Sequence, residues 1–225
     1  MFTNQKIRMV VCNLMGTLIK DKGESVSLFY NTIQQIQPSL IPSNIYSLHK
    51  NSIRNIIPSY ISQSNQEIHK RTLKNIRNEY ETNLLKTYQS TSSVTLVHPK
   101  IPLYLENLRS HGIKVCVISD YDSQLHTWLL DKFELNWYLD DWISRDSMYI
   151  SHSHPNIVQT FMQRHSMERS REVILISDNH KDIEIGKRAN CYTVGTLSGE
   201  DNEITLSYTF PDLVLDNIVY LRIVK

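Results

Sequence analysis

The sequence predicts an α/β protein: a doubly wound, mainly parallel sheet with an inserted α-helical segment. Short apolar runs rich in β-branched residues alternate with segments of helical periodicity, which is the pattern of βαβ units. Directly after the first of these runs the alternation stops, and residues 20–97 show no strand-like run until their end. These two observations together predict a sheet core interrupted by a helical insert.

Five short apolar runs are the expected strands. The first, residues 8–12, is apolar almost throughout, as expected of a strand buried on both faces of a parallel sheet, and Gly16 offers a turn shortly after it. The others are residues 113–118, 173–176, 191–194 and 211–216, and we expect a terminal helix after the last.

Helical patterns fill the gaps between these runs. They cover residues 103–108, which end before Gly112, residues 155–162, which Pro155 opens, and residues 183–189. Ligands of doubly wound sheets bind at the carboxyl ends of the strands, so candidate site residues are sought directly after each run.

The insert is expected to be a cap domain. Ile68, Leu73, Ile76, Tyr80 and Leu84 recur at helical spacing. The expected division is therefore a core of residues 1–19 and 98–225 and a helical cap of residues 20–97. The cap holds nine basic and five acidic residues, an excess that either attracts an anion or belongs to a solvated helix surface.

Composition and charge argue against several classes of protein. The chain has 225 residues, 40% of them hydrophobic and 21% charged, which is typical of a folded globular protein. A net charge of +1 gives no reason to expect nucleic acid or an anionic membrane as partner. We find no run long enough to cross a bilayer and no signal peptide, so a cytoplasmic protein is expected. Its oligomeric state is left open.

The cysteines (Cys12, Cys116 and Cys191) are widely spaced within apolar runs and are expected to be buried free thiols.

Four blocks carry a resemblance to a known family. They are Val10-Val11-Cys12-Asn13-Leu14-Met15-Gly16-Thr17-Leu18-Ile19, the strand that ends at Ser119, His154-Pro155, and Ile176-Ser177-Asp178-Asn179-His180-Lys181-Asp182. In this order they resemble the hhhhDxDGTL, Ser/Thr, Lys-Pro and GDxxxD motifs of the haloacid dehalogenase superfamily. The likeness leans toward its phosphonoacetaldehyde hydrolase-like and phosphatase-like branches. It implies a Rossmann-like core with a cap inserted after the first strand.

The first block departs from the family at both catalytic positions. The family's nucleophilic Asp corresponds to Asn13, and its general acid/base Asp corresponds to Met15. An amide supplies no anionic nucleophile, and a thioether transfers no proton. Alternatively, Asn13 is a strand-end residue that bonds the backbone and holds the loop.

The other blocks retain part of the family pattern. Ser119 and nearby backbone N–H groups could cradle a phosphate. His154 stands where the family has a charged Lys, and an unperturbed imidazole is fully charged only below about pH 6.5. Asp178 would bind a metal with Asp182 as its partner or orienting group, and because Mg²⁺ prefers charged oxygen ligands, Asn13 weakens that site. The alternative is that both carboxylates serve a turn and a helix start. His180 lies between them and is expected to be exposed.

Three further groups have two interpretations each. Lys50 lies in a segment that weakly resembles the Schiff-base region of phosphonoacetaldehyde hydrolases. Asp120 and Asp122 either replace a missing carboxylate or cap the next helix. The tryptophans Trp128, Trp137 and Trp142 are expected to pack in core and loops, although Trp137 with Tyr138 could form a contact surface.

We expect a pseudoenzyme with a binding, regulatory or scaffolding role. Its partner would be a small anionic ligand in a core–cap cleft or another protein. The first alternative is a repurposed hydrolase or lyase that acts on a small phosphorylated, phosphonate or carbonyl substrate. Its cleft residues would be Ser119, Asp120, His154, Asp178, Asp182 and Lys50. The second alternative is deamidation of Asn13, which would restore the nucleophile.

Overall fold

The computed structural model describes residues 6–36, 38, 70–144, 146 and 156–223. The chain divides into two compact units, one made of residues 1–20 and 96–225 and the other of residues 21–95. Within the described ranges, none of the helices is both long enough and apolar enough to cross a membrane.

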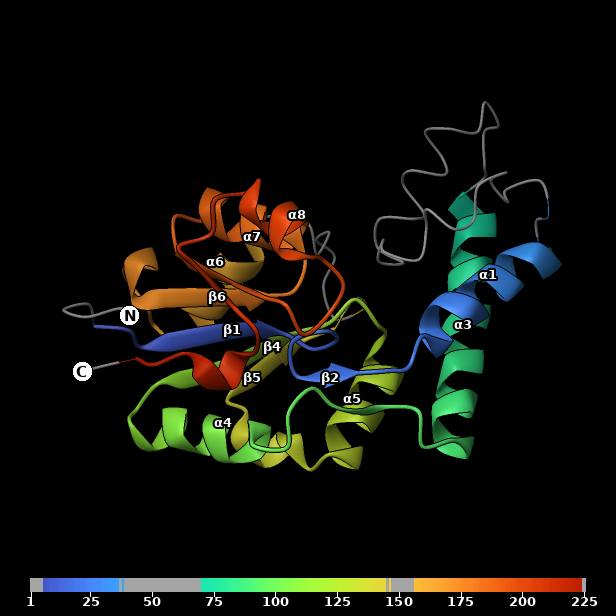
Figure 1. Cartoon of the computed structure of the whole chain (residues 1–225), viewed down its shortest axis with the longest axis horizontal. Coiled ribbons are helices and arrows are strands. Elements are labelled where there is room, and N and C mark those ends of the chain that lie inside the picture. The colour runs from blue at the N-terminus through green and yellow to red at the C-terminus, as the bar shows by residue number, and fades with distance from the viewer. Residues whose placement is uncertain (1–5, 37, 39–69, 145, 147–155, 224–225) are drawn as a thin grey trace. The chain divides into compact units, whose positions relative to one another are not determined.

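The larger unit is built on a six-stranded parallel sheet in the order β5-β4-β1-β6-β7-β8 (Figure 1). Its strands are β1 (Met9–Asn13), β4 (Lys114–Ile118), β5 (Asp141–Ile143), β6 (Val173–Ser177), β7 (Tyr192–Thr196) and β8 (Leu213–Leu215). The doubly wound parallel sheet expected from the sequence is thereby confirmed. β2 (Ile19–Lys20) and β3 (Thr95–Leu96) form a separate two-stranded sheet.

The central strand β1 is buried along its whole length. Met9 and Val11 pack with residues of β4, β6, α6 (Asn156–Arg164) and α7 (His180–Arg188) in the main apolar cluster. Figure 1 shows α4 (Ile101–Ser110) and α5 (Ser123–Lys132) on the other side of the sheet. Cys12 is fully buried, as expected, and burial raises the pKa of its thiol far above the usual value. Strong burial on both faces explains why this run is recognisable in the sequence.

Several elements of the larger unit differ from expectation. The last strand is shorter than expected, and a 3₁₀ turn at Ile218–Tyr220 follows it instead of a helix. The edge strand β5 and the short helix α8 (Glu203–Ser207) were not predicted. Both are too short to give a periodic pattern.

The smaller unit contains two described helices, α1 (Glu24–Ile36) and α3 (Lys70–Ser90). They pack against each other through Phe29 and Tyr80, whose rings meet edge to face at 5.2 Å between centroids. The Tyr88 hydroxyl donates to the Asp21 carboxylate at 2.7 Å. Lys50 lies outside the described residues.

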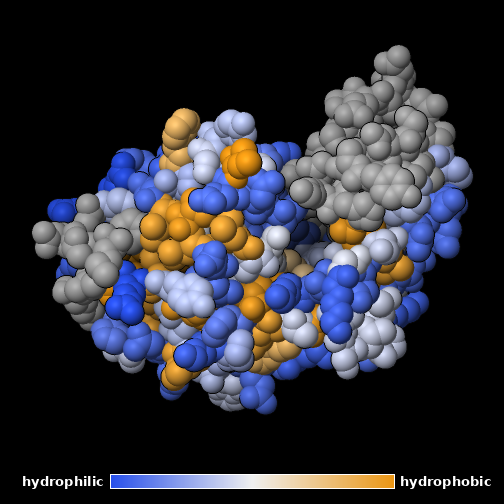
Figure 2. Space-filling model, in the orientation of Figure 1, coloured by the Kyte–Doolittle hydropathy of each residue, from blue (hydrophilic) through white to orange (hydrophobic). Residues whose placement is uncertain are grey.

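The surface of the larger unit carries apolar patches among hydrophilic side chains (Figure 2). Its exposed large apolar residues are Leu103, Trp137, Ile204, Tyr208, Phe210 and Tyr220. Trp137 is 78% exposed, so the expectation that it packs in the core or a loop is wrong.

Candidate functional site

The loops after β1, β4, β6 and β7 meet at the carboxyl edge of the sheet. Register places Asn13 opposite Ile118 on β4 and Cys12 opposite Ile176 on β6. Ser119 and Asp178 therefore follow the two strands that flank β1, one of them on each side. This is the place where doubly wound sheets bind their ligands.

Asn13 uses its amide nitrogen to connect two of these loops. Nδ2 donates to the main-chain oxygen of Met15 at 2.9 Å and to Oδ1 of Asp178 at 3.2 Å. The second contact joins residues 165 positions apart in the chain. Asn13 is buried, and its amide bonds both the neighbouring backbone and the carboxylate of Asp178.

The carboxylate of Asp178 is surrounded by donors of the protein. Oδ1 also accepts from the Thr17 hydroxyl at 3.2 Å, and Oδ2 accepts from the main-chain N–H of Glu200 at 3.0 Å. Burial raises the pKa of Asp178 to about 6, against the lowering effect of hydrogen bonds such as that from Glu200.

Two glycines form the walls around this carboxylate. A Cβ atom on Gly16 would lie 1.9 Å from Oδ2 of Asp178, and one on Gly199 would lie 2.1 Å from the same atom. Gly16 also has φ +80°, in the region that favours glycine. Any side chain at either position would displace Asp178, so both glycines are needed for the observed packing.

Asp182 lies in the first turn of α7 and is fully buried. Its Oδ2 accepts from the Ser177 hydroxyl at 2.7 Å, and the same hydroxyl oxygen accepts from the main-chain N–H of Asn179. The structure therefore gives Asp182 a role in fixing the loop that carries Asp178. Within the described ranges, no group of three or more His, Cys, Asp or Glu residues could hold a metal ion.

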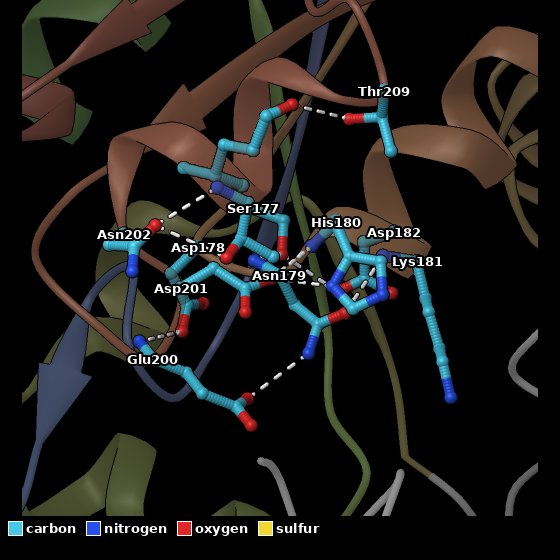
Figure 3. A network of polar contacts seen from close by, with 12 residues as sticks. Ser177, Asp178, Asn179, His180, Lys181, Asp182, Glu200, Asp201, Asn202 and Thr209 are labelled. Carbon is cyan, nitrogen blue, oxygen red and sulfur yellow. Dashed lines mark hydrogen bonds and ion pairs between the residues drawn. The ribbon is translucent and has the colours of Figure 1, made fainter. Parts of the chain in front are cut away.

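The loop after β7 is locked onto the loop after β6 (Figure 3). Asn179 donates from Nδ2 to Glu200, and the main-chain N–H of Asp201 donates to the Asp178 carbonyl. His180 contacts Oδ2 of Asp201 through both its main-chain N–H, at 2.6 Å, and its Nδ1, at 2.7 Å. His180 is thus partly buried and paired, and the expectation that it is exposed is wrong.

Sequence reasoning missed this second loop. Ser198 donates from its hydroxyl to the Gly16 carbonyl at 2.7 Å, while Gly199 and Glu200 pack directly on Asp178. The available signal was the polar run Ser198-Gly199-Glu200-Asp201-Asn202, which begins four residues after the end of the strand predicted over residues 191–194. Polar residues that follow a strand at this edge of the sheet lie where doubly wound sheets bind ligands.

The loop after β4 is held by its own side chains. Ser119 is buried, and its hydroxyl oxygen accepts from the main-chain N–H of Tyr121 at 3.1 Å. Asp122 caps α5 by accepting from the Leu125 N–H at 2.9 Å, which is the capping role expected from the sequence. Met15 is partly buried beside these loops. His154 lies outside the described residues.

The chain has a doubly wound parallel sheet, an acidic site at the carboxyl edge of that sheet, and a helical insert after the first strand. Together these features define a class of α/β proteins. The family model for haloacid dehalogenase-like hydrolases matches residues 13–196. The chain belongs to this family, as the four motifs indicated.

Comparison with individual proteins agrees with this membership. A phosphoglycolate phosphatase of Aquifex aeolicus is 31% identical over 140 residues, which are 62% of this chain and 64% of that protein. The chain thus matches less than two thirds of this relative's length.

Solved structures share the fold. A haloacid dehalogenase-like hydrolase from Bacteroides fragilis aligns with a TM-score of 0.78 at 17% identity, covering 96% of this chain and 100% of the other. A phosphonoacetaldehyde hydrolase-like protein from Oleispira antarctica aligns with a TM-score of 0.71 at 16% identity, covering 99% and 92%.

Proposed function

We propose that this chain is a non-catalytic member of the family, a phosphatase-like protein that binds a ligand or a partner and transfers no phosphoryl group. The observation that carries the proposal is the state of residue 13. Its side chain is a neutral amide that donates hydrogen bonds to Met15 and Asp178. The nucleophile position of the fold is therefore occupied by a group that acts as a hydrogen-bond donor within the protein.

Two chemical requirements of the family's reaction are unmet by these residues. Covalent catalysis by a carboxylate needs an anionic oxygen, and the amide of Asn13 has none. Protonation of a leaving group needs an acid within reach of the reacting oxygen, and Met15 has no proton to give. The proposal rests on both substitutions together.

Deamidation of Asn13 would reverse the first substitution, but the backbone opposes it. The usual route needs the main-chain nitrogen of Leu14 to attack the Asn13 side chain. That N–H instead donates to the Ile118 carbonyl at 2.9 Å, continuing the β1–β4 pairing. A nitrogen held in a hydrogen bond of the sheet is poorly placed to act as a nucleophile, so we take residue 13 as asparagine in the folded protein.

The names of the relatives indicate which small ligand should be tested first. Because relatives are named phosphoglycolate phosphatase, 2-phosphoglycolate is the first small anion to test for binding without turnover. Calorimetric titration of the purified protein with this compound, with inorganic phosphate as a second titrant, measures such binding. A protein partner is the alternative if neither anion binds.

Activity assays test the proposal directly. The wild-type protein, the double variant Asn13→Asp/Met15→Asp and the control Asn202→Asp are assayed with 2-phosphoglycolate and a panel of phosphate esters in the presence of Mg²⁺. Asn202 is exposed and caps α8, where Asp serves equally well. We expect no turnover by wild type or control. Wild-type turnover at rates normal for enzymes, at least about 1 s⁻¹, would reject the proposal.

A repurposed enzyme is the second candidate, and one observation favours it. Burial raises the pKa of Asp178 to about 6, which lies near the range useful for acid–base catalysis at neutral pH. If Lys50 formed a Schiff base with a carbonyl substrate, borohydride would trap an adduct that Lys50→Ala abolishes. A panel of carbonyl compounds that leaves the protein mass unchanged would reject this candidate.

A further inference from the structure

Phosphatases of this family generally use Mg²⁺, so the fit of this site to a divalent cation can be examined. Mg²⁺ requires near-octahedral oxygen ligands at about 2.0–2.1 Å and is held in proteins chiefly by carboxylates. A fitting site therefore offers oxygen atoms with free lone pairs that face a common point.

The oxygen atoms at this edge face donors of the protein instead. The Met15 carbonyl and Oδ1 of Asp178 accept from the same nitrogen, Nδ2 of Asn13. Oδ1 accepts a second bond from Thr17, and Oδ2 is held by the Glu200 N–H. An N–H group presents positive charge to each oxygen, so a cation that approaches the same oxygens meets repulsion and must displace these bonds.

The surroundings of Asp178 fix its carboxylate in the orientation in which Oδ1 faces Asn13. Its carboxylate lies between Gly16 and Gly199, where even a methyl group would overlap it. Asp182 is turned to Ser177. The donor set of the wild-type protein disagrees with a bound Mg²⁺.

We infer that the Asn13 amide takes the structural place of the divalent cation. Its two N–H groups hold together the same pair of oxygens, one from the loop after β1 and one from the loop after β6, that a cation at this edge would bridge. The site is therefore assembled without metal, and a ligand of this edge binds with the same affinity in EDTA and in Mg²⁺. The inference deepens the proposed function and rests on it in taking residue 13 as an amide.

The inference can be tested in variants that lack the amide. If the Asn13 amide takes the place of a cation in the wild-type protein, a bound cation should stabilise a variant in which that amide is missing. Thermal unfolding is measured for wild type, Asn13→Asp, Asn13→Ala and the control Asn202→Asp, each in EDTA and in 10 mM MgCl₂ at matched ionic strength. Asn13→Asp supplies a charged ligand, Asn13→Ala removes the donors, and Asn202→Asp adds the same charge at an exposed helix cap that does not contact Asn13 or Asp178 in any of the hydrogen bonds described above.

We expect Mg²⁺ to raise the Tm of both Asn13 variants by about 2–4 °C and to leave wild type and Asn202→Asp unchanged. In the Asn13 variants, MnCl₂ should broaden the amide resonances of Gly16, Thr17 and Glu200 at concentrations that leave the wild-type resonances sharp. The inference is overturned if Mg²⁺ stabilises wild type as much as Asn13→Asp, or if it stabilises neither Asn13 variant.

Failure of this inference and failure of the proposed function are distinguishable. Binding of Mg²⁺ to wild type without turnover would reject the metal-free site alone. Turnover in EDTA would reject the proposed function and leave the metal-free site standing. Should Asn13→Asp remain unfolded under both conditions, Asn13→Ala decides by the same criterion.

Discussion

Replacing Asn13 by Asp should destabilise the protein in a way that depends on pH. The variant exchanges an N–H donor 3.2 Å from Oδ1 of Asp178 for a carboxylate oxygen. Two unit charges about 4 Å apart repel by about 4 kcal/mol at an effective dielectric constant near 20. The hydrogen bonds lost to Asp178 and Met15 add about 1–2 kcal/mol.

The direction in which the stability of Asn13→Asp changes with pH follows from proton linkage. Repulsion raises the pKa of the carboxylate pair in the folded state further above its unfolded value, so the folded state binds a proton that the unfolded state releases. Stability is then lost as pH rises, and it is largely retained where the pair shares a proton. We expect a loss of about 4–6 kcal/mol in the free energy of unfolding at pH 8 and a clearly smaller loss at pH 5.

Urea denaturation in EDTA at the two pH values measures this difference. Asn202→Asp is the matched control, because the same charge at an exposed helix cap should change stability by no more than about 0.5 kcal/mol. An equal loss for Asn13→Asp at pH 5 and pH 8, or no loss at pH 8, would refute the assignment of the Asn13–Asp178 hydrogen bond.

Three further predictions concern single residues. Gly199→Ala should cost at least about 2–3 kcal/mol in urea denaturation, because its Cβ overlaps Asp178; a neutral effect would mean that the loop after β7 is not packed as described. Asp178 should titrate with a midpoint near pH 6 in carboxyl ¹³C spectra, and a midpoint below 4 would contradict its burial. His126→Phe should stabilise the protein, since burial lowers the pKa of His126 to about 4 and both ring nitrogens lack hydrogen-bond partners among the described residues. The gain in the free energy of unfolding over wild type should be larger at pH 5 than at pH 8, because the lowered pKa of His126 costs wild type stability as pH falls from about 6.5 toward 4. A gain that is equal at the two pH values would contradict this prediction.

Asp178 and His126 make opposite contributions to the pH dependence of stability in the wild-type protein. Asp178, with its pKa raised by burial, loses stability as pH rises from about 4 to 6. His126, with its pKa lowered by burial, gains stability over nearly the same interval. The two contributions therefore have opposite signs over this interval. His126→Phe should therefore reveal the contribution of Asp178 as stability that declines between pH 4 and pH 6.

The fold was predictable where strands are buried on both faces. The runs that became β1, β4 and β6 are nearly continuous apolar segments, and that signal needs no tertiary information. β5 has three residues and begins with a half-buried Asp141 at the sheet edge, so its pairing with β4 is visible only in three dimensions.

The site was predictable in its residues but not in its contacts. Strand ends and motif spacing placed Asn13 and Asp178 at one edge of the sheet. The sequence could not show that the amide of Asn13 donates to Asp178, because that contact depends on the parallel pairing of β1 with β6. Gly199 escaped notice for the same reason, since its importance arises from the carboxylate packed against it.

Phosphoryl transfer to residue 13 is the event that decides between a binding protein and an enzyme. Wild type and the Asn13→Asp/Met15→Asp variant are mixed with excess 2-phosphoglycolate or p-nitrophenyl phosphate in Mg²⁺, quenched in acid within milliseconds, and examined by intact mass and peptide mapping. We expect the wild-type protein to keep its unmodified mass, with the peptide that contains Asn13 unchanged. A phosphoryl group on that peptide of the wild-type protein would contradict the account.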